Sequence, residues 1–404
     1  MYDNSEDQEA LEVIARLDER TNIEETDING KRTTVIHEGY ASLHLFEIEQ
    51  FVKYIQKGED GFVDEMTRYS RKWKIRPLYL GKKYYRLVDE WLGHYSDIYH
   101  YSARVEVFYA ACKELGLLGA YPFSFVGKPE HIVRADGMRN MDVFNILIEK
   151  IRARCQTREF KERERLRGEN AKRNVRRALA LEEAMFSEKT GRSRWLVLSL
   201  TLNYKPKFRC EITPEMMQQH RERFFAARDF NKLMSGIKGY VWAIEQGEES
   251  GLHLHVILFY SSGFNHDVFI AKQILDYWIN TVTQGKGDGW NSNTGWRKKW
   301  YAERGHGIGV GQINWDETEK RQALRVNLAY LGKAEQYLMA RTTKRIHTFG
   351  MGRVPEKKKS GRPRSCGDGS NVGGSSFDVD RFSEAATDET GFELPDGVDE
   401  TAAD

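Results

Sequence analysis

The chain has 404 residues, of which 40% are hydrophobic, and its 20 Phe, 19 Tyr and 9 Trp are enough to fill more than one core. No run of 18 apolar residues occurs, which argues against a membrane-spanning helix, and the four cysteines are too widely spaced for a zinc site or a disulfide framework. The formal net charge of +2 hides two acidic ends: residues 1–30 carry −8 and residues 365–404 carry −10, which leaves about +20 on residues 31–364. So basic a region favours a polyanionic partner such as nucleic acid, with a merely soluble charged surface as the alternative.

The N-terminal part divides into a tail and a helical region. Residues 1–30 predict a disordered acidic tail, and they lack the apolar segment of a secretion signal, so we expect a cytoplasmic protein. From residue 41 to residue 121, apolar residues recur at spacings of three and four, as in Leu45, Ile48, Phe51, Val52 and Ile55, and in Tyr84, Leu87, Val88, Trp91 and Leu92. This pattern predicts a mostly helical N-terminal domain over residues 31–143.

Residues 144–190 form a long charged stretch in which arginines and lysines are dispersed among glutamates. The composition is typical of a solvated helix that connects two domains. A dedicated DNA clamp is the alternative, and the sequence leaves both interpretations open.

A second domain is predicted over residues 191–348. The β-type run from Trp195 to Tyr204 predicts its first strand, and Thr213 followed by Pro214 predicts the start of a helix that reaches about Leu233. Two further strands, at residues 240–246 and 252–260, are separated by a short polar connection, which is typical of an antiparallel hairpin.

The rest of this domain alternates helix and strand. We predict a helix over residues 267–283, a loop rich in Gly, Asn and Trp over residues 285–296, a strand over residues 308–315, and a last helix from Asp316 or Thr318 to about Arg341. The order suits one antiparallel sheet with helices packed on it, so the predicted fold class is α+β.

Two histidines stand two residues apart in the predicted strand 252–260. His253 and His255 must point to the same face of that strand, so both can reach one metal ion. A pair of half-buried, hydrogen-bonded histidines is the alternative.

The preceding strand ends its apolar run with Glu245, which the hairpin places opposite the histidines. A set of two imidazoles and one carboxylate suits manganese or magnesium acting on phosphate oxygens. Glu248 and Glu249 are rival ligands on the connecting loop.

The last predicted helix carries a tyrosine and a lysine on one face. Tyr330 and Lys333 are three residues apart, and a nearby cation together with a metal-bound phosphate would favour the phenolate, which is a competent nucleophile. A surface tyrosine beside a surface lysine is the alternative.

These three elements, in this order, resemble the HUH endonucleases, which are named for two histidines that flank a bulky apolar residue and which use a tyrosine nucleophile. Within that superfamily, residues 242–259 and 330–338 look most like the filamentous-phage (inovirus) gene-two-type and related prophage replication initiators. The resemblance covers residues 195–349, under half of the chain.

The resemblance implies a rolling-circle replication initiator that acts in a bacterial cytoplasm. It implies that the enzyme cuts and rejoins one DNA strand through a 5′-phosphotyrosyl link to Tyr330, with Lys333 as electrostatic support and a host replication helicase and polymerase as partners. Tyr337 lies two helical turns after Tyr330 and is a candidate second nucleophile. A non-catalytic DNA-binding regulator on the same fold and a transposase of the same chemistry are the alternatives.

Two segments combine cations with features that bind DNA. The Gly- and Trp-rich segment interleaves aromatic rings with positive charges, which suits stacking on bases and contact with phosphates, although core-anchoring tryptophans are the alternative. Residues 349–404 begin with a basic segment similar to an AT-hook and end in a disordered acidic tail. The candidate DNA-binding residues are Lys286, Trp290, Trp296, Arg297, Lys298, Lys299, Arg362 and Arg364.

Overall fold

A computed structural model describes the chain over residues 23–28, 31–36, 43–66, 73–119, 123–247, 250–263, 265–303, 307–333, 338–341 and 346–355. Most of the two predicted tails lies outside the described residues, as do Glu248, Glu249, Tyr337, Arg362 and Arg364. A two-stranded antiparallel pair, β1 (Ile23–Ile28) and β2 (Lys31–Ile36), begins inside the segment predicted to be a disordered tail. The predicted boundary at residue 30 is therefore wrong.

The N-terminal region is mostly helical around one aromatic core. Every apolar residue of the first periodic pattern is at most 1% exposed, and the ring of Phe51 lies 5.3–6.2 Å from the rings of Tyr84, Trp91, Phe108 and Phe144. Its elements are α2 (Leu43–Gln56), β3 (Phe62–Met66), β4 (Trp73–Pro77), α3 (Tyr79–Lys83), α4 (Val88–Gly93), β5 (Tyr99–Tyr101) and α5 (Ala103–Glu114). Strands β3 and β4 form a small antiparallel hairpin.

The charged stretch contains two helices. Helix α6 (Asn140–Cys155) packs its apolar side into the aromatic core, and α7 (Arg158–Phe186) begins after a break at Thr157, whose Oγ1 accepts a hydrogen bond from the Phe160 N–H at 3.3 Å. The prediction of a single helix over residues 144–190 is wrong, because the Thr157 cap starts a second helix.

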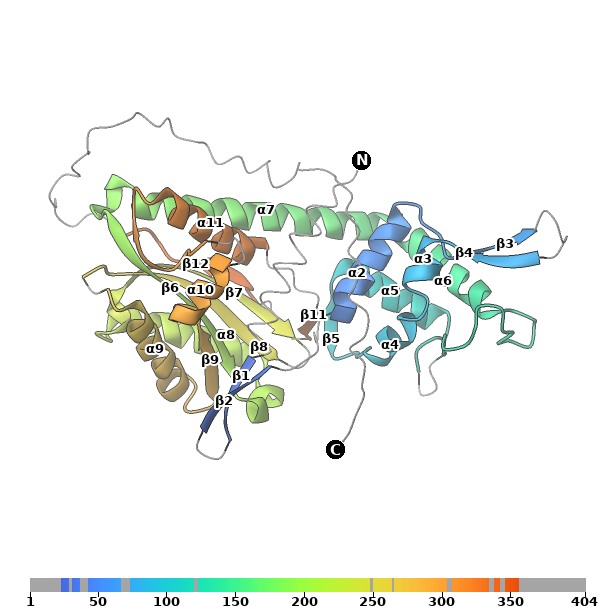
Figure 1. The fold of residues 1–404 in the computed structure, drawn as a ribbon, viewed down its shortest axis with the longest axis horizontal. Helices are drawn as coiled ribbons and strands as arrows, with labels where there is room; N and C mark the ends of the chain where they lie inside the picture. The colour runs from blue at the N-terminus through green and yellow to red at the C-terminus, as the bar shows by residue number, and fades with distance from the viewer. Residues whose placement is uncertain are drawn as a thin grey trace, which may run out of the picture. The chain divides into compact units, whose positions relative to one another are not determined.

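The second domain is built on one antiparallel sheet, as predicted (Figure 1). The strands follow the order β10-β6-β8-β7-β12, and β9 pairs with the second half of β6. The strands are β6 (Arg194–Tyr204), β7 (Ile237–Gly247), β8 (Gly251–Tyr260), β9 (Gly287–Asn291), β10 (Gly311–Asn314) and β12 (Phe349–Met351). Strands β7 and β8 form the predicted hairpin.

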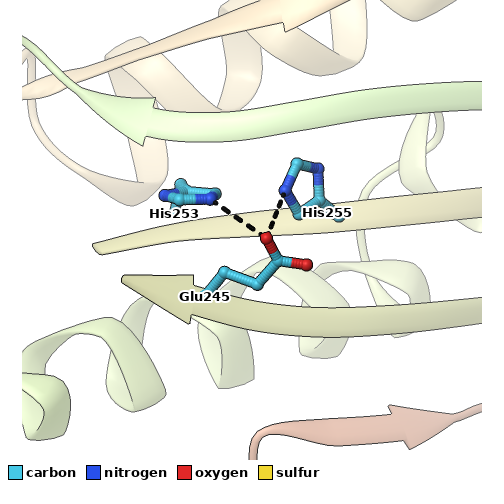
Figure 2. Close-up of side chains that lie close together, drawn as sticks. All are labelled: Glu245, His253 and His255. Carbon is cyan, nitrogen blue, oxygen red and sulfur yellow. Dashed lines mark ion pairs between the residues drawn. The ribbon is translucent and has the colours of Figure 1, made fainter. Parts of the chain in front are cut away.

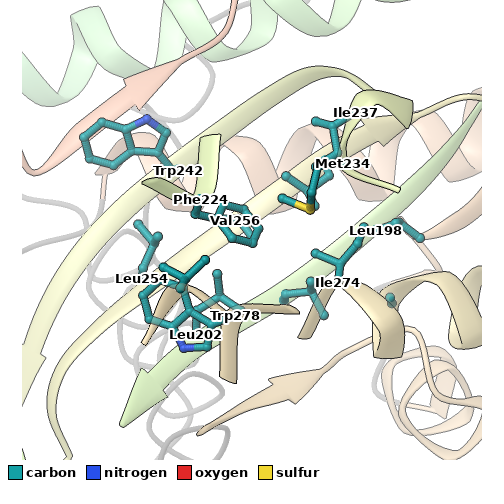
Figure 3. Close-up of a cluster of buried hydrophobic side chains, with 14 of the residues drawn as sticks. Leu198, Leu202, Phe224, Met234, Ile237, Trp242, Leu254, Val256, Ile274 and Trp278 are labelled. Atoms are coloured by element: carbon teal, nitrogen blue, oxygen red, sulfur yellow. The ribbon is translucent and has the colours of Figure 1, made fainter. Parts of the chain in front are cut away.

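Helices cover both faces of this sheet. Helices α8 (Pro214–Ala226) and α9 (Asp267–Tyr277) pack on one face, where alternate residues of β6 and β8 form an apolar cluster (Figure 3). Helices α7 and α11 (Thr318–Lys333) pack on the other face, against a cluster that includes Trp195, Ile257 and Phe259. The strand period of two therefore assigns each residue of β6, β7 and β8 to one pair of helices.

Three predicted elements differ from the structure. The segment expected to be a loop contains β9 and the start of α10 (Gly295–Glu303), and a π-helical turn (Trp278–Val282) follows α9. The last helix ends at Lys333 and not near Arg341 as predicted, because β11 (Leu338–Ala340) follows it and pairs with β5 of the N-terminal region. Short 3₁₀ turns occur at Glu188–Thr190, Pro206–Glu211, Ala227–Asp229 and Met234–Gly236.

None of the helices within the described residues is long and apolar enough to cross a membrane.

Candidate metal centre

Strand β8 changes character along one of its two faces. The even-numbered residues, from Leu252 to Leu258, point into the cluster beneath α8 and α9. The odd-numbered residues Ile257 and Phe259 pack under α7 and α11, and His253 and His255 continue that same face toward the start of the strand. Both histidines are buried, at 4% and 3% exposure.

Glu245 faces the two histidines from the neighbouring strand. The register of β7 and β8 places Glu245 directly opposite His253. Its Oε2 lies 3.5 Å from His253 Nε2 and 3.4 Å from His255 Nε2 (Figure 2), and its side chain is 16% exposed. One donor atom from each of the three residues lies within 4.8 Å of the others, so the three side chains form a group that can hold a metal ion.

The far nitrogen of each imidazole is held by a fixed partner. His253 Nδ1 lies 3.1 Å from the carbonyl oxygen of Gly251, and His255 Nδ1 lies 3.0 Å from Thr201 Oγ1 on β6. A carbonyl only accepts, so Nδ1 of His253 carries a proton, and Nε2 is the nitrogen that can bind a metal ion. Such partners fix the ring orientation that a metal ligand needs.

The electrostatics of the group favour an ionised carboxylate. Burial by itself would raise the pKa of Glu245, but the adjacent His255 and His253 imidazoles outweigh burial and hold that pKa well below its usual range. Two neutral imidazoles and one carboxylate are a recognised donor set for a divalent transition metal. Donors at ~2.1 Å from a shared ion stand about 3.0–3.4 Å apart, close to the two spacings between Glu245 Oε2 and the imidazole nitrogens.

Tyr330 reaches this group from helix α11. Its Oη donates a hydrogen bond to Glu245 Oε1 at 3.2 Å, while Oε2 of the same carboxylate faces the histidines. The ring packs beside the apolar cluster beneath α7 and α11. The structure thus brings together the tyrosine, both histidines and the glutamate that the sequence singles out from three separate segments. Lys333 is the last residue of α11, and its side chain lies outside the described atoms.

Helix α7 holds α11 over the sheet through buried contacts. Glu182 is fully buried, and its carboxylate accepts hydrogen bonds from Arg321 Nε at 2.7 Å and Arg325 Nε at 2.9 Å. Nearer the site, Gly332 packs on Val175 so closely that an added Cβ would lie 2.7 Å from the Val175 backbone nitrogen. These contacts fix the position of Tyr330, two residues before Gly332.

The predicted DNA-binding segment is partly interior. Trp290 is 8% exposed and Arg297 is 1% exposed, and the Arg297 guanidinium lies 4.7 Å and 4.4 Å from the ring centroids of Trp290 and Trp296. Lys286 pairs with Glu211 at 2.9 Å, and Lys298 pairs with Asp267 at 2.5 Å.

Trp296, which is 49% exposed, and Lys299 lie on the surface. The burial of Trp290 and Arg297 fits core anchoring, the alternative interpretation of this segment.

Two residues that support the site, Thr201 and Glu182, belong to no sequence motif. Thr201 is not singled out by any motif, although its place in an alternating strand puts it on the histidine face. Glu182 looks like one more charge of a solvated helix, because its partners Arg321 and Arg325 come from a segment about 140 residues later.

Comparisons with protein-family models, with curated proteins and with solved structures find no match to this chain.

Proposed function

We propose that this protein is a metal-dependent single-strand DNA endonuclease of the HUH type, with Tyr330 as its nucleophile. The observation that supports the proposal is the hydrogen bond from Tyr330 Oη to Glu245, in which a tyrosine hydroxyl lies beside a two-histidine, one-carboxylate group. A structural tyrosine has no need to meet a preorganised metal-ligand set. A nucleophile that attacks a phosphate held at that set must lie there.

Each residue of the site has a separate role in the proposed reaction. His253, His255 and Glu245 Oε2 would hold a manganese or magnesium ion, which supplies charge stabilisation at the scissile phosphate. Glu245 Oε1 orients the Tyr330 hydroxyl through the 3.2 Å hydrogen bond. Tyr330 Oη loses its proton and bonds to phosphorus, the bond from phosphorus to the 3′ oxygen breaks, and that oxygen leaves as a protonated 3′ hydroxyl. The DNA 5′ end stays linked to Tyr330, and the reverse reaction rejoins the strand.

The biological role that we propose is initiation of rolling-circle replication. It draws on the resemblance to filamentous-phage and prophage initiators, in which the tyrosine follows the histidine pair along the chain, as Tyr330 does here. The free 3′ hydroxyl would prime a polymerase. The basic charge of residues 31–364 supports DNA as the substrate.

A nicking assay with a matched control tests the proposal. The full chain is incubated with labelled single-stranded DNA from its own replicon, with Mn²⁺ or with EDTA, and the products are separated under denaturing conditions. We expect a covalent protein–DNA adduct that requires Mn²⁺ and is absent from Tyr330→Phe. Tyr277→Phe, which changes a partly buried tyrosine of α9 on the opposite face of the sheet, should form the adduct normally.

Binding without cleavage would contradict the proposal. If the wild-type protein binds the DNA but forms no adduct and makes no cut with either Mn²⁺ or Mg²⁺, the protein is a DNA-binding regulator and the catalytic proposal fails.

A further inference from the structure

Helix α7 carries two halves of different charge. Residues 158–169 contain five cations and four glutamates, so their charges nearly cancel. Residues 170–181 contain four cations, Lys172, Arg173, Arg176 and Arg177, and no carboxylate. We call these four residues the mid-helix cations. A charge of +4 over about three turns of one helix is concentrated enough to attract a polyanion.

Two of the five cations of the first half form ion pairs within the protein. Arg165 pairs with Glu162 at 2.7 Å and with Glu169 at 2.5 Å. Arg167 pairs with the buried Glu49 of α2 at 3.1 Å and with Glu164 at 3.5 Å. With four glutamates beside its five cations, this half of α7 carries a net charge of only +1, as expected of a connecting helix.

The mid-helix cations are arranged differently. All four side chains are exposed, and Arg173 donates a hydrogen bond to Asn170 Oδ1 at 2.7 Å. Within the part of the chain that the structure describes, no carboxylate forms an ion pair with any of the four. Lys172 and Arg176, and likewise Arg173 and Arg177, stand four residues apart, where like charges on a helix repel each other. A bound polyanion would relieve this repulsion.

The mid-helix cations lie at the same level of the α7 and α11 helix pair as the candidate nucleophile. Val175, in their centre, packs on Gly332, two residues after Tyr330. Further along, Glu182 of α7 pairs with Arg325 of α11, so the two helices run antiparallel. Residues one or two positions from Val175 and Gly332 lie within about one helical turn of that contact along the axis. Arg176 and Tyr330 are therefore at nearly the same level of the helix pair.

We propose that Lys172, Arg173, Arg176 and Arg177 form a phosphate-binding track for the single DNA strand on one side of the cleaved phosphate. The inference rests on the proposed function, since it takes the strand bound at Tyr330 to be the one that runs along α7. The track contacts the sugar-phosphate backbone and does not read sequence, because exposed cations on a helix reach phosphates and no aromatic ring stands among them.

The test measures binding without cleavage. In the full chain with Tyr330→Phe, the affinity for a fluorescent single-stranded oligonucleotide is measured by anisotropy over a range of salt concentrations. We expect replacement of all four mid-helix cations by Gln to weaken binding by at least about tenfold at low salt. The slope of log affinity against log salt should become shallower by about 0.7 for each phosphate that the variant no longer neutralises.

A matched control on the same helix separates local contact from overall charge. Replacement of Arg158, Lys161, Arg163 and Arg165 by Gln removes the same total charge from the first half of α7, and it should weaken binding much less. The triple variant Arg173→Lys, Arg176→Lys, Arg177→Lys keeps the charge and should bind nearly as the parent does. Since Gln and Lys are good helix formers, circular dichroism should show every variant folded.

The outcomes distinguish this inference from the proposed function. If the two Gln variants weaken binding equally, or if neither changes the salt slope, the track does not exist, and nicking by the wild type still stands. If the mid-helix variant alone loses binding but the wild type forms no covalent adduct, the track stands and the nuclease proposal fails. Tighter binding to duplex than to single-stranded DNA through the same four residues would also overturn the inference.

Discussion

The two faces of the central sheet differ in the residues that they bury, although they share the same strands. On the face beneath α8 and α9, β8 contributes Leu252, Leu254, Val256 and Leu258, an unbroken apolar row. On the face beneath α7 and α11, the row begins with Phe259 and Ile257 and ends with His255 and His253. The first face provides stability along its whole length. The second face has polar residues in place of apolar ones at one end, where His253, His255 and Glu245 lie near Tyr330.

The sheet holds the buried polar side chains at fixed positions. A buried imidazole or carboxylate is costly unless it is partnered, and the partners here are Thr201, the Gly251 carbonyl and Glu245. The apolar face holds the strands in register, so the polar end keeps its spacing in the absence of an ion. Substitutions on the two faces should therefore change different quantities.

The largest expected effect is on metal binding and comes from a substitution at the histidine end of β8. His255→Ala removes one of three donor atoms, and we expect the affinity for Mn²⁺ to fall by more than about 100-fold, beyond the loss typical of a supporting residue. Because Glu245 and Thr201 lose a buried partner, the free energy of unfolding of the metal-free protein should also fall, by about 1–3 kcal/mol. Isothermal titration with Mn²⁺ and urea unfolding in EDTA measure the two quantities. Binding of Mn²⁺ to the folded variant with wild-type affinity would show that His255 is not a ligand.

A substitution on the apolar face should lower stability and leave metal affinity nearly unchanged. Leu258→Ala leaves a cavity at a fully buried position, and the free energy of unfolding should fall by about 2–5 kcal/mol. The affinity for Mn²⁺ should stay within about twofold, since Leu258 points away from the histidines. Urea unfolding and titration of the folded variant check this. A large loss of metal affinity would show that the two faces are not independent.

An intermediate effect should arise from the contact between α7 and α11. Gly332→Ala forces its Cβ against the Val175 backbone, so α11 must move and carry Tyr330 away from Glu245. A displacement of about 1 Å can lower a rate by on the order of 100-fold, and we expect slower adduct formation with unchanged Mn²⁺ affinity.

Gly168→Ala is the control for this substitution. Gly168 lies on α7 with open space around its Cα, so an added methyl group should leave the rate unchanged and stabilise the helix by about 0.5–1 kcal/mol. If both variants form adduct at the wild-type rate, the close packing at Gly332 does not position the nucleophile.

The smallest effect concerns the partner of an imidazole. Thr201→Val keeps the shape of the side chain but removes the oxygen that lies 3.0 Å from His255 Nδ1. Loss of such a supporting hydrogen bond should lower the affinity for Mn²⁺ by about 10-fold to 100-fold. Thr201→Ser keeps the hydroxyl and should restore most of the affinity. No difference between the Val and Ser variants would mean that the hydrogen bond does not orient the ring.

The grouping of His253, His255 and Glu245 is predictable from sequence because strands have a short period. A spacing of two between His253 and His255 leaves one arrangement on a strand, and a short connection between two strands fixes which residue of β7 stands opposite them. The antiparallel sheet and the helices α8, α9 and α11 follow from similarly local patterns. The convergence of Tyr330 on Glu245 is not local, and it needed the structure.

Features that depend on partners far away in the sequence could not be predicted from the sequence. The sequence shows which residues of α7 are charged but not which of them are paired: Glu182 is buried by Arg321 and Arg325, Arg167 forms ion pairs, and the mid-helix cations are exposed. Trp290 and Arg297 lie inside the fold because β9 pairs with β6, a pairing that the Gly-rich composition of the segment conceals. Local composition cannot separate a buried ion pair from a solvated one.

Mass spectrometry of the covalent adduct tests the central claim most directly. The wild-type protein is reacted with single-stranded DNA and Mn²⁺, digested with nuclease and protease, and the peptide that carries a nucleotide is sequenced. The account predicts a 5′-phosphate linked to Tyr330, and no such peptide when EDTA replaces Mn²⁺. A nucleotide on Tyr337 or on any other residue, or an adduct that forms equally in EDTA, would contradict the account.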